Sequence, residues 1–137
     1  MANAIYPKFK QAALSGGANH DLSAGTVRMV LVDLADYTYS ATHEFLSDVA
    51  GASRVATSAA LASKTFTNGT FDAADQSPAF TGVSGDVSEA LIFFVDTGVE
   101  GTSRLVYFND TGTTGMPITP DGGNINAVFN ASGIFAL

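Results

Sequence analysis

The feature that most constrains this fold is a pair of apolar segments joined by a Gly-containing turn, within residues 87–110. In residues 91–95 and again in residues 104–108, mostly apolar side chains follow one another instead of alternating with polar ones. A strand with this pattern needs apolar cover on both faces, as interior strands have. Gly98 and Gly101 lie between the two segments and can adopt positive φ at little cost. The pattern therefore predicts an antiparallel hairpin at the centre of a core.

Further segments also have the patterns of strands. Residues 26–33 are apolar on both faces toward their end, residues 124–130 alternate apolar and polar side chains, and residues 133–137 are apolar. The Asn68-Gly69 pair is typical of a two-residue hairpin turn, because both residues accept positive φ. Together these segments predict a mainly β fold, namely a small antiparallel β-sandwich or barrel-like domain with one or two short helices.

Two segments have the start and stop signals of short helices. Pro7 suits the first turn of a helix that would end before Gly16. Ser40 can cap a second helix over residues 41–49. Residues 50–63 are mostly Ala, Ser and Thr, which leaves both an extended and a partly helical conformation open.

Length and composition limit the remaining possibilities. We expect a single β-rich domain over residues 1–137, with residues 1–17 as an N-terminal arm that contains the first helix. The absence of cysteine excludes disulfides and thiolate metal sites. A net charge of −7 with only six Lys and Arg residues argues against a nucleic-acid partner. No apolar run reaches the roughly 18 residues that span a bilayer, so we expect a soluble protein with no membrane partner.

Charged residues make up 14% of the chain, which is low for a fully solvated surface. This composition indicates that a partner or neighbouring copies of the chain cover part of the surface.

The sequence shows no constellation typical of catalysis. His20 and His43 lack the spacings that place a metal ion or a general base, and the serines lack the Gly-x-Ser-x-Gly turn of a nucleophile. The Gly-containing segments lack the Lys-Ser/Thr ending of a phosphate loop. We therefore predict no enzyme, no catalytic residue and no cofactor.

Four aspartates are candidates for a calcium site. Asp72, Asp75, Asp110 and Asp121 lie near asparagines and offer the hard oxygen atoms that calcium prefers. Their spacing does not match a twelve-residue calcium loop, and Asp also favours turns through its own side-chain hydrogen bonds. We therefore predict turn roles for these residues and no metal site.

Several short successions of residues, spread over nearly the whole chain, together carry a family resemblance. They are residues 1–7 (MANAIYP), 10–12 (KQA), 27–33 (VRMVLVD), 37–40 (YTYS), 66–73 (FTNGTFDA), 94–98 (FVDTG), 102–105 (TSRL), 110–112 (DTG) and 117–123 (PITPDGG). In these successions the chain resembles small structural proteins of tailed bacteriophages and prophages. The resemblance implies a component of the virion, made in the host cytoplasm.

Within that class we favour a capsid decoration or cement protein, which binds the major capsid protein or other virion proteins and stabilises the assembled head. Such a protein acts in multiple copies or as a homo-oligomer, because many small interfaces add up over the shell. A negative charge suits the outside of the shell. A tail, neck or tail-tip protein is the first alternative. A carbohydrate-binding module with Tyr37, Tyr39 and Tyr107 as its platform is the second, although the chain has no Trp.

The predicted partner interface comprises Ile5, Tyr6 and Phe9 of the arm together with Tyr37 and Tyr39. Termini and loops can dock on a partner without disturbing a core, which favours these positions. The alternative is that Tyr6 and Phe9 cover the domain's own core, as large apolar side chains usually do.

Overall fold

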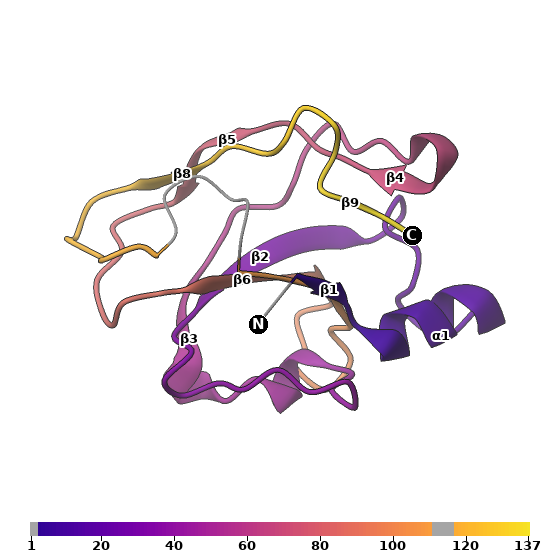
Figure 1. Cartoon of the computed structure of the whole chain (residues 1–137), viewed down its shortest axis with the longest axis horizontal. Coiled ribbons are helices and arrows are strands. Elements are labelled where there is room, and N and C mark those ends of the chain that lie inside the picture. Colours follow the sequence, from indigo (N-terminus) through magenta and orange to yellow (C-terminus); the bar gives the residue numbers. More distant parts are fainter. Residues whose placement is uncertain (1–2, 111–116) are drawn as a thin grey trace.

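The computed structural model describes residues 3–110 and 117–137, which form a layered and mainly β molecule (Figure 1). Its elements are β1 (Ala4–Ile5), α1 (Pro7–Ser15), β2 (Thr26–Val32), the 3₁₀ turns η1 (Leu46–Asp48) and η2 (Gly51–Ser53), β3 (Arg54–Thr57), the 3₁₀ turn η3 (Thr67–Gly69), β4 (Thr70–Phe71), β5 (Gln76–Phe80), β6 (Ala90–Asp96), β7 (Leu105–Asn109), β8 (Ile125–Ala127) and β9 (Phe135–Ala136). The predicted fold class, a small antiparallel β-sandwich-like arrangement with a short helix, is confirmed. Residues 1–2 of the predicted arm lie outside the described residues. Within the described ranges, none of the helices has the length and apolar character needed to span a membrane.

A five-stranded sheet in the order β1-β7-β6-β2-β3 forms the middle layer, and each pair of adjacent strands in it is antiparallel. The predicted hairpin is confirmed as β6 and β7. The second predicted apolar strand, β2, pairs with β6 from Thr26↔Asp96 to Val32↔Ala90. Every residue of β6 except Asp96 is buried. Since burial of a large apolar side chain contributes roughly 1.5–3 kcal/mol, this strand is the centre of the core.

The side chains of β7 alternate between two covering layers. Tyr107 faces the outer layer, where its ring centroid lies 4.9 Å from that of Phe135. Phe108 faces the opposite side, where its ring centroid lies 5.4 Å from that of Tyr39. In Figure 1 the strands β4, β5, β8 and β9 lie above the sheet and the segment with the 3₁₀ turns lies below it. This double cover explains why the hairpin segments are apolar without alternation.

The outer layer is a pair of short two-stranded sheets. β4 pairs with β9 and β5 pairs with β8, so residues 70–80 run antiparallel to residues 125–136. Phe129 of this layer packs against Phe93 of β6, with ring centroids 6.1 Å apart. The two C-terminal strands predicted from the sequence are thus confirmed, at reduced length.

The predicted Asn-Gly hairpin turn is also confirmed. Asn68 and Gly69 have φ values of 53° and 79°. Thr65 and Asp72 exchange two backbone hydrogen bonds across the turn, at 2.9 and 3.0 Å. The turn directs the chain from residue 65 back into β4 of the outer layer.

The first predicted helix is confirmed as α1. Phe9 and Ala12 face the core, and the helix ends at Gly16, whose φ of 70° is left-handed. The segment that the sequence left open, residues 50–63, contributes the extended edge strand β3.

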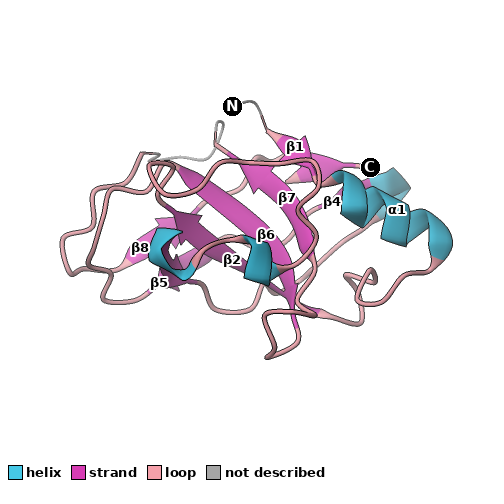
Figure 2. Ribbon diagram, turned by 90° about the horizontal axis from the view of Figure 1, so that it is seen from below, coloured by secondary structure: helices cyan, strands magenta, loops and turns pink. Residues whose placement is uncertain are grey.

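The predicted helix over residues 41–49 is wrong. Only the short turn η1 forms there, and the stretch crosses one face of the sheet (Figure 2). The Leu46 N–H donates to the Ser103 carbonyl at 2.8 Å, and the Leu105 N–H donates to the Glu44 carbonyl at 2.9 Å. These long-range bonds to the β6–β7 hairpin occupy backbone groups that a helix would pair internally.

Candidate functional site

The residues predicted as a partner interface lie mostly inside the molecule. Tyr6, Phe9 and Tyr37 are only 0%, 3% and 4% exposed, whereas Ile5 and Tyr39 are half-buried. The Tyr6 N–H donates to a β7 carbonyl at 3.0 Å and β1 pairs with β7, so the arm is part of the sheet edge. The interface prediction is therefore corrected for the three buried side chains. The alternative, in which Tyr6 and Phe9 cover the core, matches their burial.

A hydrogen-bond network, buried between the two tyrosines and partly buried at the histidine, joins Tyr6 and Tyr37 to His43. Tyr6 Oη lies 2.8 Å from Tyr37 Oη, which in turn lies 2.8 Å from His43 Nδ1. Burial raises the pKa of Tyr6 well above its usual value, and burial is also the main cause that raises the pKa of Tyr37 to about 12. Both hydroxyls therefore stay protonated at neutral pH, and these hydrogen bonds tie the segment between β1 and α1 to the loop that follows β2.

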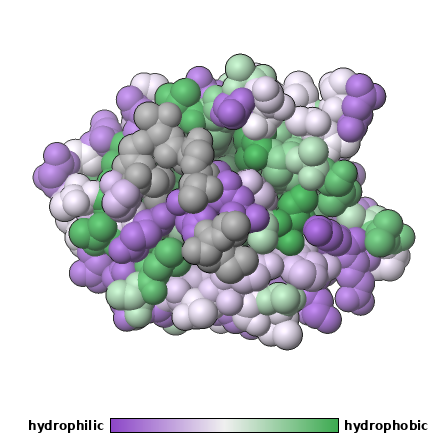
Figure 3. All heavy atoms as spheres, in the orientation of Figure 1, coloured by the Kyte–Doolittle hydropathy of each residue, from purple (hydrophilic) through white to green (hydrophobic). Residues whose placement is uncertain are grey.

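An apolar groove of about 420 Å³ opens between α1, the Asn-Gly hairpin and β9. One wall consists of Phe66, Phe71 and Phe135, with successive ring centroids 5.6 and 5.3 Å apart. Phe9 and Ala13 of α1 form another wall. Hydrophobic atoms gather over this part of the surface, between α1 and the β4–β9 pair (Figure 3). The remaining lining residues are His20, Asp21, Leu22, Ser23, Gly69, Thr70 and Leu137.

A protruding leucine stands beside this groove. Leu14 follows Ala13 on α1, and its side chain is 90% exposed. Phe66, at the opposite side of the groove, is 41% exposed. The sequence contains a weak signal for this site, because Leu14 is a large apolar residue on a side of the helix that Phe9 does not share.

The charges around the groove are of both signs. Lys10 lies one helical turn before Leu14, on the same outward side of α1. Asp21 lines the groove, and hydrogen bonds from the hydroxyl and the N–H of Ser23 hold the pKa of its carboxyl below the usual range. In the described part of the chain, neither Lys8 nor Lys10 forms an ion pair. The three arginines pair with Asp96, Glu100 and Glu44.

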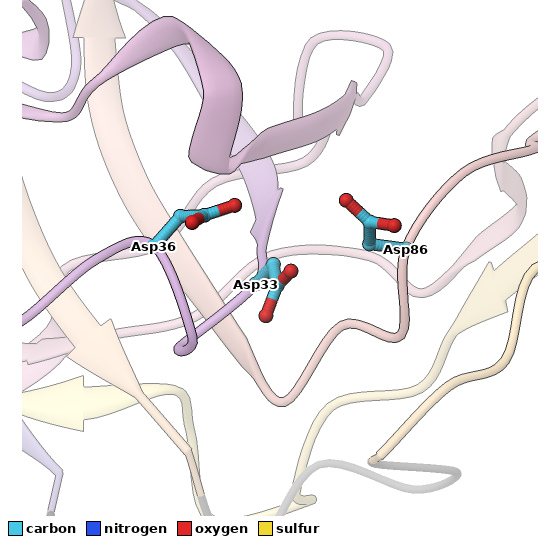
Figure 4. Close-up of side chains that lie close together, drawn as sticks. All are labelled: Asp33, Asp36 and Asp86. Carbon is cyan, nitrogen blue, oxygen red and sulfur yellow. The ribbon is translucent and has the colours of Figure 1, made fainter.

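Three other carboxylates meet where β2 ends. Asp33, Asp36 and Asp86 each place one oxygen within 4.8 Å of the other two (Figure 4). Asp33 is buried and its Oδ1 accepts a hydrogen bond from the Ala35 N–H at 2.8 Å, whereas Asp36 and Asp86 are exposed. Oxygen atoms in this arrangement suit a hard divalent cation, and exposed acidic groups also adopt it without one.

The aspartates considered for calcium in the sequence lie elsewhere. Asp72 and Asp121 accept N–H hydrogen bonds of 2.9 Å within their own turns, and Asp75 accepts one of 2.8 Å from across the outer layer. The Asp110 N–H donates to Asn3 Oδ1 at 2.8 Å. Sequence spacing missed the cluster at the end of β2, because one of its members comes from the distant loop before β6.

The chemistry that these sites offer is binding. The groove presents apolar surface with a cation and an anion beside it, and the acidic cluster presents carboxylate oxygens. His20, which also lines the groove, places its Nδ1 2.5 Å from the Gly17 carbonyl oxygen.

No family model matches the chain, and no curated protein matches its sequence.

Proposed function

We propose that this chain is a structural protein of a tailed-bacteriophage virion, which binds the assembled head as a decoration or cement protein. The observation that carries the proposal is the apolar groove with the exposed Leu14 beside it, on a chain with a net charge of −7. A concave apolar surface with charged side chains at its edge is a common form of protein-binding site. The residue successions that resemble phage structural proteins indicate the kind of assembly.

A head-binding role suits the physical properties of the chain. A small protein that binds only the assembled shell stabilises it by mass action, and many copies multiply a modest affinity. The acidic composition disfavours the DNA-filled interior and favours the outer surface of the shell. Both arguments require that part of the surface be covered by protein, which fits the charged content of only 14%.

The two alternatives differ in their support. A tail, neck or tail-tip protein of the same size would use the same groove, so location in the particle separates it from a head protein. The carbohydrate-binding alternative needs an exposed aromatic platform. Tyr37 and Tyr107 are only 4% and 8% exposed and Tyr39 is half-buried, so these tyrosines do not form one.

Copy number and location test the proposal. The chain is quantified by mass spectrometry in purified virions that carry it, relative to the major capsid protein, and labelled chains are located by electron microscopy. We expect a copy number of the same order as that of the capsid protein, on the head. A few copies confined to the tail would establish the alternative, and absence from the particle would overturn any virion role.

A matched pair of variants tests the groove itself. Leu14→Asp places a charge beside the groove, whereas Val99→Asp alters a side chain that is 60% exposed in the β6–β7 turn, outside the groove lining. We expect the first change to reduce incorporation into particles and the second to leave it unchanged. Equal incorporation of both variants would assign the contact to another surface.

A further inference from the structure

We propose that the groove receives a second copy of this chain, with Leu14 of each copy inserted into the groove of the other. The inference deepens the proposed function, because it names the partner of the same site and rests on that site being a protein-binding surface. It is tested on the isolated chain, so its failure is distinguishable from failure of the virion role.

The first argument is the arrangement of protrusion and hollow. Leu14 is 90% exposed, while Phe9 and Phe71 in the adjacent groove are only 3% exposed. An apolar protrusion next to an apolar hollow on one surface is self-complementary under a two-fold axis, because each copy then offers what the other accepts. The contact is closed, since both protrusions and both hollows are used within one dimer.

The second argument is charge. Two copies with a net charge of −7 repel each other over most of their surfaces. All 13 acidic residues and four of the six basic ones lie outside α1, whose nine residues include Lys8 and Lys10 and no acid. The helix therefore contributes only positive side-chain charge to a contact made through it, which lowers the repulsion between two acidic copies there.

The charges beside the groove also match under this arrangement. Lys10 is one turn from Leu14, so it accompanies the leucine into the contact. The receiving groove is lined by Asp21, whose lowered pKa keeps the carboxyl ionised at neutral pH. Each copy thus brings a cation to the partner's anion, and the two-fold axis makes this pairing twice.

Sedimentation velocity of the purified chain over a range of concentrations is the primary test. We expect a dimer at high concentration. For Leu14→Asp we expect a dimer dissociation constant at least about tenfold higher, as for the loss of an apolar anchor at an interface centre. Lys10→Glu should also weaken the dimer, with a larger effect at low salt. Val99→Asp is the matched control and should leave the dimer unchanged. Thermal unfolding of each variant as a monomer confirms that its fold is intact.

Cross-linking tests the geometry directly, because the chain contains no cysteine. A Leu14→Cys chain is mixed with a Phe66→Cys chain and treated with a short bifunctional maleimide, so that any link between the two must be intermolecular. We expect efficient linkage of this pair, and little when Val99→Cys replaces Phe66→Cys.

Three results would overturn the inference: a monomer at every concentration, a dimer insensitive to Leu14→Asp, or equal cross-linking to the control position. If the chain is monomeric while Leu14→Asp still blocks its incorporation into particles, the groove binds another virion protein. That outcome rejects self-association and leaves the proposed function standing.

Discussion

Removal of the Tyr37 hydroxyl is expected to cost more stability than removal of the Tyr6 hydroxyl, although the two groups share one hydrogen bond. Tyr37 Oη contacts both Tyr6 Oη and His43 Nδ1, each at 2.8 Å. Tyr37→Phe therefore leaves the Tyr6 hydroxyl without a partner in a residue that is 0% exposed. Tyr6→Phe leaves Tyr37 bonded to His43, so no buried hydroxyl is stranded.

The magnitudes follow from the cost of stranded polar groups. A buried group without a partner costs about 1–3 kcal/mol, whereas an ordinary hydrogen bond contributes about 0.5–1.5 kcal/mol. We expect Tyr37→Phe to lower the free energy of unfolding by about 2–3 kcal/mol and Tyr6→Phe by about 1 kcal/mol. The double variant should lose only about 1–1.5 kcal/mol, since neither hydroxyl then remains to be stranded. The coupling energy between the two sites, which is the sum of the two single losses minus the loss in the double variant, is thus about 1.5–3 kcal/mol.

Urea unfolding of the unchanged protein, the two single variants and the double variant measures this double-mutant cycle. The slope against denaturant should be the same for all of them, so that midpoints report stability directly. Thermal unfolding provides a check, because 1 kcal/mol corresponds to roughly 3–4 °C for a chain of this length. Effects that add within about 0.5 kcal/mol, or a larger loss for Tyr6→Phe than for Tyr37→Phe, would refute the reasoning.

Three further predictions concern a turn, a hydrogen-bonded acid and the acidic cluster. Gly69→Ala should lower the free energy of unfolding by about 1–2 kcal/mol, because φ at Gly69 is 79°; Gly51→Ala, where an added Cβ meets nothing within 4 Å, is the control and should stay within about 0.5 kcal/mol in urea unfolding. Burial alone would raise the pKa of Asp48, but two backbone N–H hydrogen bonds outweigh it and lower that pKa. The stability that Asp48 contributes is thus present above about pH 4 and lost as the pH falls through the lowered pKa of its carboxyl. The difference in free energy of unfolding between the unchanged protein and Asp48→Asn should therefore shrink on acidification. A difference that stays constant with pH would contradict this. Asp86→Asn should stabilise the protein by less than about 1 kcal/mol at low salt through relief of like-charge repulsion, and a gain that persists in high salt would indicate another cause.

The elements that were predicted correctly are those with local signals. The two apolar segments of the β6–β7 hairpin and the run in β2 could only be interior strands, because their side chains need cover on both faces. Asn68-Gly69 specifies its turn through backbone conformation, and Pro7 with Gly16 delimits α1 in the same way.

The helix predicted over residues 41–49 shows where local signals end. Its composition and its Ser40 cap are compatible with a helix, yet the Leu46 N–H bonds to a carbonyl of the β6–β7 turn. A contact made by residues so distant in sequence is invisible to any local pattern.

The sequence by itself determined that the chain has an interior β-hairpin, a β-rich core and an acidic surface, because these depend on side-chain type and short-range periodicity. Only the tertiary structure decided which face of each segment is used. It buried Tyr6 and Tyr37 in the core, left Leu14 in solvent, and brought α1, the Asn-Gly hairpin and β9 together around one groove. The physical reason is that exposure and grouping depend on the packing of distant segments against each other, which no single segment specifies.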